Sequence, residues 1–289
     1  MSLGHRLLEI GYPFINFTNS IRDLACSSAP RLRVLMYHDI NPRDMKLLTT
    51  TIAWLKKSWN FLSPLEFEQV MHGRQKLSQN SLLLTFDDGF FSNLAVARNI
   101  LNPLEIKAIF FVIPDFVDKI QQDQSRTFIE KHLRLELDTA ASINHLKNMH
   151  WGDLRQLLDH GHVIGAHSMS HESLGNVTSR NVLTREIIEA ADRLESELRT
   201  EIKHFAFPFG NFYSFSKQAL EVARSRYLFI HSGIRGNNIP GSVPRTIRRD
   251  ALNPADKRSL VGSFLLGGAD FRYRRYNQVL DDWMLHQPC

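Results

Sequence analysis

Short runs of apolar residues alternate along most of the chain with segments that carry apolar residues at helical spacing. Several runs are apolar at every position, as expected for strands that are covered on both faces. Strands and helices in alternation are typical of a parallel sheet or barrel. The pattern predicts seven strands: Val34–His38, Leu82–Phe86, Ala108–Ile113, Val163–Ala166, Phe205–Phe207, Leu228–His231 and Val243–Ile247.

Two helices are predicted between these strands. Apolar residues recur along one face of the first, at Ile187, Ala191, Leu194 and Leu198. Acidic and basic residues four positions apart can form ion pairs on another face of this helix and stabilise it. The second runs over Trp151–His160, and Gly161 supplies its stop signal.

The chain contains no internal repeat and no Gly/Ser linker, which indicates one domain over residues 31–252 with an extension at each end. Residues 1–30 are predicted to form a helical N-terminal extension. Its apolar residues could face a core or lie on a membrane, and Gly11 and Pro13 favour the core because they break the helix that an anchor needs. Residues 119–150 carry many charges and are expected beside the site entrance. Residues 253–289 are expected to be a helical or irregular extension.

Composition excludes several classes of protein. The 289 residues are 43% hydrophobic, enough for a sizeable core and too many for a disordered chain. No run approaches the roughly 20 apolar residues of a membrane span. The first residues, interrupted by Glu9, Gly11 and Pro13, do not resemble a secretory signal, so we expect a cytoplasmic protein. The two cysteines, Cys26 and Cys289, cannot form a disulfide framework.

The net charge of +5 is spread along the chain apart from two basic segments, residues 245–249 and 272–275. In the second, arginines interleave with Tyr273 and Tyr276, a pattern that could suit nucleic acid or an anionic membrane. No nucleic-acid motif accompanies it, so we expect a solvated tail, no nucleic-acid partner, and peripheral membrane contact only as an alternative.

The strand over Leu82–Phe86 runs directly into Asp87-Asp88-Gly89. Two adjacent carboxylates repel each other, a cost that is relieved if a metal neutralises one while the other titrates. An Asx-turn or a helix cap is the simpler interpretation of this tripeptide alone.

A second polar segment, His167-Ser168-Met169-Ser170-His171, follows the strand over Val163–Ala166. Side chains at i and i+4 share a face on one helical turn and can bind one ion. Two His and an Asp from a parallel strand give three N/O ligands with positions open for water, as in catalytic metal sites. A third segment, Phe205–Gly210, is either a simple turn after a core strand or a wall whose backbone N–H groups face an oxyanion.

These segments, in this order, resemble the motifs of the polysaccharide deacetylase family, the carbohydrate esterases with NodB homology. Thr85-Phe86-Asp87-Asp88-Gly89 and His167-Ser168-x-x-His171 match the first two motifs, and the segment over 205–210 is similar to the third. Val34–His38 resembles the first strand of many members. The resemblance covers roughly residues 31–250 and implies a distorted (β/α)7-type barrel with active residues at the carboxyl ends of strands.

The resemblance also implies roles for individual residues. Asp87 would be the general base, and Asp88, His167 and His171 would bind a divalent metal, commonly zinc, with cobalt, nickel and manganese as alternatives. A neighbouring carboxylate can take a proton from a metal-bound water as that water attacks an acyl carbon. The backbone N–H of Phe209 would stabilise the oxyanion.

Two elements of the family pattern are altered. Ala206 stands where members often carry an arginine that orients the base, and we expect Arg245 to supply the guanidinium. The late Leu-x-x-His motif, whose histidine protonates the leaving amine, is not evident. His231 is the first candidate for this acid and His38 the second; either could also be a satisfied histidine at a strand end.

We therefore expect a metal-dependent hydrolase that removes an acyl group, acetyl first, from an N-acylated amino sugar. A cytoplasmic location favours a nucleotide-linked or lipid-linked sugar intermediate as the substrate. A deformylase or amidase acting on a non-carbohydrate amide is an alternative, because the same metal and base serve any small acyl amide. A carbohydrate-binding relative without catalysis is another, although the intact Asp87, Asp88, His167 and His171 argue against it. The sequence does not specify the sugar, its linkage, the metal or the oligomeric state.

Overall fold

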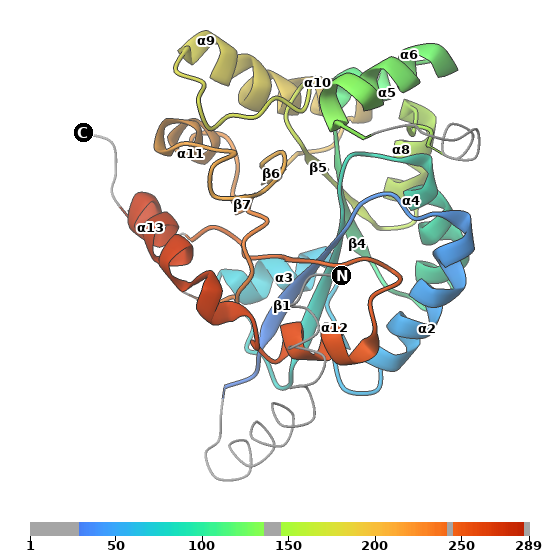
Figure 1. Cartoon of the computed structure of the whole chain (residues 1–289), viewed down its shortest axis with the longest axis vertical. Coiled ribbons are helices and arrows are strands. Elements are labelled where there is room, and N and C mark those ends of the chain that lie inside the picture. Colours follow the sequence, from blue (N-terminus) through green and yellow to red (C-terminus); the bar gives the residue numbers. More distant parts are fainter. Residues whose placement is uncertain (1–28, 136–145, 242–244, 286–289) are drawn as a thin grey trace.

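The computed structural model describes residues 29–135, 146–241 and 245–285. The predicted N-terminal extension over residues 1–30 therefore lies almost entirely outside the described residues. In the described part, a curled sheet of parallel strands is surrounded by helices (Figure 1). This is the distorted (β/α) barrel that the resemblance implied.

The strands are joined in the order β7-β6-β5-β4-β3-β1-β8, with β2 also beside β3, and every pairing between them is parallel. Their bounds are β1 Leu32–Tyr37, β2 Asn60–Phe61, β3 Ser81–Phe86, β4 Ala108–Val112, β5 Val163–Ala166, β6 His204–Ala206, β7 Phe229–His231 and β8 Asp250–Ala251. The first six predicted strands are confirmed, with ends that differ by one or two residues.

The segment over residues 247–251 joins the two ends of the sheet. Ile247 forms an isolated parallel bridge with His231 of β7, and Asp250 pairs with Leu35 of β1. Residues 243 and 244 of the seventh predicted strand lie outside the described residues. The rest of the prediction is wrong in its bounds, because the pairing with β1 falls at residues 250–251. The observed strand β8 is too short and too polar to show a period-2 pattern of apolar residues. Strand β2 was not predicted because it too has only two residues.

Helices fill the connections between strands. The longer ones are α2 Met45–Leu55, α3 Pro64–Met71, α8 Trp151–Asp159, α10 Ala190–Leu198, α11 Lys217–Arg224, α12 Arg258–Leu265 and α13 Arg274–Leu285. Shorter turns are η1 Pro42–Asp44, α4 Phe91–Val96, η2 Ala97–Leu101, α5 Pro114–Val117, α6 Gln122–Phe128, η3 Ile129–Leu133, α9 Arg180–Leu183, η4 Thr184–Glu189 and η5 Asp270–Arg272. Both predicted helices are confirmed, the first as η4 followed by α10.

Local sequence explains where α3 begins. Ser63 accepts a hydrogen bond from the backbone N–H of Glu66, whose carboxylate accepts one from the N–H of Ser63 in return. Pro64 occupies the first helical position, where its missing N–H has no cost. The helix then delivers Phe67 into the barrel interior, where it packs near Phe229.

Two apolar clusters lie on the two sides of the sheet. Leu83 of β3 belongs to a cluster inside the barrel with Phe111, while Leu82 and Leu84 belong to the larger cluster under the helices. Side chains alternate along a strand, so Thr85 and Asp87 follow Leu83 to the inner side. The alternation thus places a carboxylate at the carboxyl end of the barrel interior.

An ion pair to Asp270 ties the described part of the C-terminal extension to the barrel. Arg33 of β1 is fully buried, and its guanidinium binds Asp250 at 2.7 Å and Asp270 at 2.7 Å. Helix α13 lies beside α11 (Figure 1). The extension is therefore part of the folded unit, and it approaches the barrel where the sheet closes.

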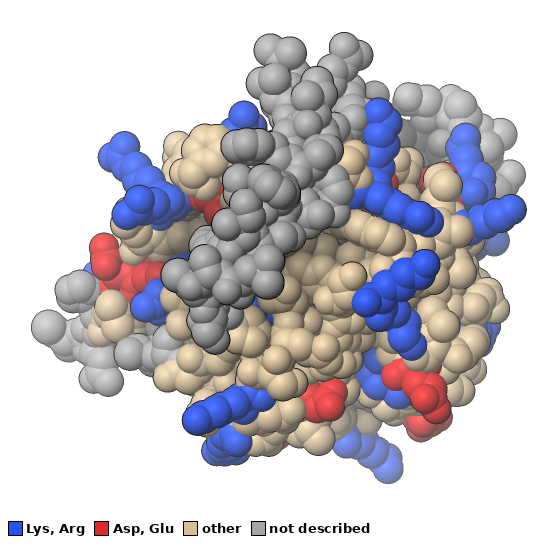
Figure 2. Space-filling model, turned by 90° about the horizontal axis from the view of Figure 1, so that it is seen from below, with Lys and Arg blue, Asp and Glu red and all other residues tan. Residues whose placement is uncertain are grey.

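On the face shown in Figure 2, Lys and Arg side chains are scattered among uncharged and acidic residues. Arg272, Arg274 and Arg275 are exposed, as expected for solvated charges. None of the helices in the described ranges combines the length and the apolar character needed to span a bilayer.

Candidate active site

Asp87 and Asp88 occupy the sharp exit from β3. The backbone N–H of Asp87 still donates to the carbonyl of Tyr37, so the strand pairing with β1 continues up to this residue. Asp88 and Gly89 then both have positive φ, 74° and 85°. A Cβ at position 89 would lie 3.3 Å from Val112, which together with the φ angle requires glycine. Both carboxylates are buried.

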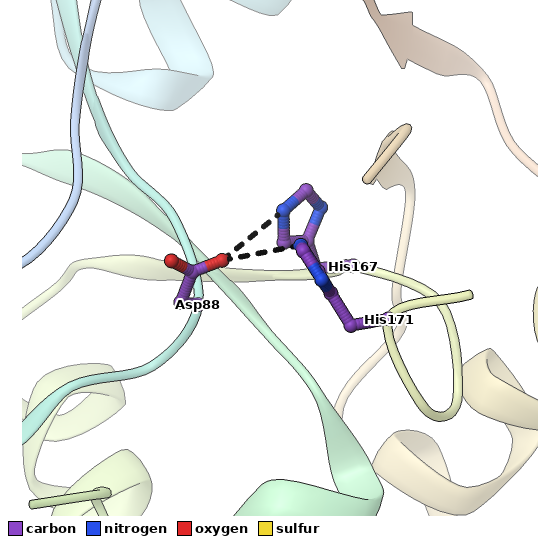
Figure 3. Close-up of side chains that lie close together, drawn as sticks. All are labelled: Asp88, His167 and His171. Atoms are coloured by element: carbon purple, nitrogen blue, oxygen red, sulfur yellow. Dashed lines mark ion pairs between the residues drawn. The ribbon is translucent and has the colours of Figure 1, made fainter. Parts of the chain in front are cut away.

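His167 and His171 lie in the loop after β5, and this loop is not the helical turn that their spacing suggested. Ser168 and His171 have φ of 58° and 64°, and the Ser168 hydroxyl accepts a hydrogen bond from the N–H of His171 at 2.9 Å. The buried Glu186 accepts hydrogen bonds from both the N–H and the hydroxyl of Ser170. Left-handed backbone and Glu186 together hold both imidazoles toward Asp88 (Figure 3).

The donor set fits a divalent cation. The Nδ1–H of His167 donates to the carbonyl of Ala206 at 2.8 Å, and that of His171 to the carbonyl of His132 at 3.0 Å. These bonds leave each Nε2 for a ligand, and each Nε2 lies 3.5 Å from Oδ1 of Asp88. That oxygen is buried and has no hydrogen-bond partner. One atom from each of the three residues lies within 4.8 Å of the others. A cation would satisfy all three donors at once.

Protonation of these groups follows from burial and mutual charge. Burial lowers the pKa of His171 to about 4, so its ring is neutral and can act as a ligand. Burial alone would raise the pKa of Asp88, but the neighbouring imidazoles of His167, His38 and His171 hold it below its usual range. In His167, the carboxylates of Asp87 and Asp88 outweigh burial and raise the pKa. A metal competes with that proton for the imidazole nitrogen.

A guanidinium fixes Asp87, but it belongs to Arg249 and not to Arg245. The Nη1 and Nη2 atoms of Arg249 donate to Oδ1 and Oδ2 of Asp87 at 2.7 Å and 2.9 Å. Its Nε donates to the carbonyl of Ser232, and the guanidinium lies over the ring of Phe111. Arg245 instead binds Asp281 on α13 at 2.8 Å. The expectation for Arg245 is wrong because the arginine that reaches Asp87 is four residues later, directly before β8.

The sequence carried a partial signal for Arg249. Ile247 belongs to the cluster inside the barrel, and a residue two positions later on an extended chain points to the same side. Among the three arginines of residues 245–249, this alternation excludes Arg248 and leaves Arg245 and Arg249. Only the contacts in the folded chain separate these two, because Arg249 binds Asp87 and Arg245 binds Asp281.

The structure separates the two candidate acids. His231 is fully buried, its Nε2 lies 3.1 Å from Nδ1 of His204, and its ring packs against Phe111 at 4.8 Å. Burial lowers the pKa of His231 well below its usual value, and the charges of His204 and Arg249 lower it further. His38 is exposed at the end of β1 and lines one pocket with Asp87. The structure therefore disfavours His231 as the acid and brings His38 to the site.

That pocket has a volume of about 440 Å³, within the roughly 300–1,000 Å³ typical of small-molecule sites. Phe209 forms part of its wall with φ of 60°, an uncommon angle for a bulky residue, and its ring packs 4.6 Å from that of His171. Gly210 beside it lies against the backbone of Gly233, where a Cβ would approach to 2.7 Å. Sequence reasoning did not place Tyr273 and Tyr276 at the site, yet both line this pocket.

Known proteins with the same fold were found by structural comparison. IcaB from Ammonifex degensii is 20% identical, with a TM-score of 0.66 over 83% of this chain and 99% of that chain. The Streptococcus pyogenes deacetylase PplD, solved in complex with acetate, is 19% identical, with a TM-score of 0.62 over 82% of this chain and 99% of that chain. At these identities the comparison shows a shared fold.

Sequence comparison extends the likeness. The Bacillus subtilis (strain 168) protein YxkH, named as a candidate polysaccharide deacetylase, is 21% identical over 197 residues, which are 66% of this chain. The match spans 61% of the length of that relative. The family model for polysaccharide deacetylase matches residues 74–227, a range that contains Asp87, Asp88, His167 and His171. Because this match covers more than half of its length, the chain belongs to the polysaccharide deacetylase family.

Proposed function

We propose that this protein is a metal-dependent hydrolase that removes the acetyl group from an N-acetylated amino sugar. One observation carries the proposal: Asp87, held by Arg249, lies beside the clustered ligand atoms of Asp88, His167 and His171, and the adjoining pocket is large enough for a sugar. Membership in the deacetylase family supports the same reaction.

Asp88, His167 and His171 would hold the divalent cation. When bound, such an ion polarises an acyl oxygen and lowers the pKa of a bound water toward about 7. Zinc suits two imidazoles and a carboxylate, and cobalt, nickel and manganese accept the same donors. The buried loop around His171 fixes the direction of the ligands before the ion arrives.

Asp87 would accept a proton from the attacking water. The two hydrogen bonds from Arg249 hold both carboxylate oxygens, so the base is oriented before substrate arrives. The Nε2 of His167 lies 3.8 Å from Oδ2 of Asp87, which places the base next to the metal ligands. We assign the proton for the leaving amine to His38, because it shares the pocket with Asp87 and is open to solvent.

The proposal also covers the kind of amino sugar, the cellular compartment and the oxyanion contact. The amino sugar would belong to a glycan or to a nucleotide-linked or lipid-linked intermediate, and the enzyme would act in the cytoplasm. The backbone N–H of Phe209 would contact the oxyanion, since this residue lies between His171 and the pocket.

Metal analysis and acetate release test the proposal. Purified protein loaded with zinc should hold about one ion and release acetate from N-acetylglucosamine oligomers. The double variant His167→Ala/His171→Ala should lose the ion, whereas His160→Ala, at an exposed histidine on the end of α8, should keep it. Asp87→Asn should keep the ion and lose at least about 10²-fold in turnover, the scale of general-base catalysis. Stoichiometric zinc in the double variant, or near-normal turnover by Asp87→Asn, would contradict the assignment.

A further inference from the structure

Three polar side chains to which the proposed reaction assigns no role are linked inside the barrel. Nε2 of His204, on β6, lies 3.1 Å from Oε1 of Glu68 on α3. Nδ1 of the same imidazole lies 3.1 Å from Nε2 of His231 on β7. Both imidazoles are fully buried, and Glu68 is 9% exposed. We call these three residues the polar chain.

The polar chain runs from the amino end of the barrel toward the catalytic base. Glu68 and His204 line a cavity of about 720 Å³ at the end where the strands begin. His231 is the last residue of β7, and the charge of Arg249 is close enough to lower its pKa. Because the strands are parallel, the carboxyl end of β7 lies at the same end of the barrel as Asp87. The polar chain therefore links the amino-end cavity to the surroundings of Arg249.

Burial and charge fix the direction of each hydrogen bond in the polar chain. Burial alone would raise the pKa of Glu68, but the hydrogen bond from His204 and the charge of Lys203 hold it below its usual value, so Glu68 is an anionic acceptor. Burial lowers the pKa of His204 and of His231, so both rings are neutral. His204 must then donate from Nε2 to Glu68 and accept at Nδ1 from the Nε2–H of His231. The Nδ1 atom of His231 carries no proton, is buried, and has no hydrogen-bond partner among the described residues.

His231 lies against the groups that support the guanidinium of Arg249. The carbonyl of the next residue, Ser232, accepts from Nε of Arg249 at 2.9 Å. The ring of Phe111 contacts both partners, with the ring of His231 at 4.8 Å and the guanidinium of Arg249 at 5.1 Å. A neutral imidazole can lie beside this buried cation, whereas a protonated one would repel it. A displaced or protonated His231 would therefore disturb Arg249, which holds both carboxylate oxygens of Asp87.

A role in stability alone does not account for the polar chain, because polar groups are costly in an apolar core. The ring of His204 stacks on Phe229 at 4.7 Å, and the ring of His231 packs on Phe111. Apolar side chains of similar size would fill this space without burying a carboxylate or leaving Nδ1 of His231 unpaired. A buried polar network can fix one arrangement of the groups around it. The arrangement fixed here is that of His231 next to Arg249.

We propose that the polar chain positions Arg249, and through it Asp87, for removal of the acetyl group. His204 is the central member, because it holds His231 on one side and Glu68 on the other. These three are positioning residues that act through Arg249. The inference rests on the proposed function, and it extends the groups that govern turnover to the amino end of the barrel, opposite the pocket.

Two neutral substitutions of His204 separate positioning from packing. In His204→Asn the amide lies near the place of Nδ1 and can accept from the Nε2–H of His231. In His204→Gln the amide lies near the place of Nε2, so it can reach Glu68 but not His231. Both variants lose the ring that stacks on Phe229, so we expect similar losses of stability in urea unfolding.

Steady-state kinetics of the zinc-loaded proteins on an N-acetylglucosamine oligomer give the main readout. His204→Gln should lower kcat about tenfold with KM and zinc affinity unchanged, the scale of one lost hydrogen bond. His204→Asn should stay within about threefold of the wild type. His72→Gln is the matched control, because the exposed His72 also packs its ring on Phe229 but lies outside the polar chain. A merely structural role would reduce activity equally in both His204 variants.

Nitrogen NMR of the histidine side chains tests the polar chain in the wild-type protein. At neutral pH, His204 and His231 should each carry a proton on Nε2 and none on Nδ1. A proton on Nδ1 of either ring, equal kcat in the two His204 variants, or a loss confined to KM or zinc affinity would each overturn the inference. Failure of the wild type to release acetate from any amino sugar would overturn the proposed function instead. The same kinetic comparison with 4-nitrophenyl acetate would then decide the role of the polar chain, since hydrolysis of this ester also needs a base to take a proton from water.

Discussion

Removing Arg249 tests how the base is held. In Arg249→Met the methionine fills much of the space of the arginine stem but leaves the carboxylate of Asp87 without its two donors. Arg249 is fully buried and Asp87 is 2% exposed, so water from the pocket replaces the two lost bonds only in part. The variant therefore places an uncompensated charge in the interior, unless Asp87 takes up a proton.

The size of the effect follows from this geometry. Breaking a buried ion pair by removing one partner costs about 3–5 kcal/mol, since the remaining charge stays desolvated. The loss of the bond from Nε to Ser232 falls within the same change. Adding Asp87→Asn to Arg249→Met removes the uncompensated charge. In a double-mutant cycle, two residues of one ion-pair network usually show an interaction free energy of about 0.5–3 kcal/mol. We expect a coupling of about 2–3 kcal/mol here, because the pair is bidentate and buried.

Urea unfolding in the presence of a chelator measures these changes without metal. The wild type, both single variants and the double variant form one thermodynamic cycle, and Arg249→Lys keeps the charge but not the planar fork. We expect the lysine variant to recover part of the stability and little of the deacetylation. A loss below about 1 kcal/mol in Arg249→Met, or additive changes in the cycle, would refute the reasoning.

Two further predictions concern histidines. His38→Ala should lower amide hydrolysis at least about 10²-fold and leave hydrolysis of 4-nitrophenyl acetate nearly unchanged, because an amine needs a proton to leave. His231→Ala should reduce both reactions alike. A loss confined to amide hydrolysis in His231→Ala, and not in His38→Ala, would make His231 the acid. Burial lowers the pKa of His162 to about 4, and its Nδ1 accepts from the N–H of Ala108. Its contribution to stability is therefore complete above about pH 6.5 and falls by about 3 kcal/mol as pH drops to 4. His162→Gln should remove this part of the pH dependence in urea unfolding between pH 7 and 4.5, and an unchanged slope would contradict the assignment.

The metal-ligand candidates could be predicted from sequence because short stretches of chain position them. Asp88 follows directly from the end of β3, and His167 and His171 follow from the end of β5. Parallel strands bring their carboxyl ends together, so two local motifs suffice to define one site. Even here the local conformation differed from expectation, since left-handed residues and not a helical turn aim the imidazoles.

The partners of these residues come from elsewhere in the chain, and only the tertiary structure identified them. Arg249 directly precedes β8, so its place beside Asp87 depends on the pairing of Asp250 with Leu35 of β1, a contact between distant parts of the chain. Arg245, four residues earlier, binds Asp281 instead. His38 and His231 both end strands, but one strand end opens to solvent while the other is covered by packing inside the barrel.

The sequence by itself determined the order of strands and helices, the two carboxylates and the two imidazoles, because periodicity and spacing are local properties of the chain. Tertiary structure decided which guanidinium orients the base, which histidine faces the pocket, and that Tyr276 of the C-terminal extension forms part of its wall. These outcomes depend on closure of the sheet and on ion pairs between distant segments, such as Arg33 with Asp250 and Asp270, which are 217 and 237 residues away along the chain. Long-range packing of this kind leaves no periodic signal in a single sequence.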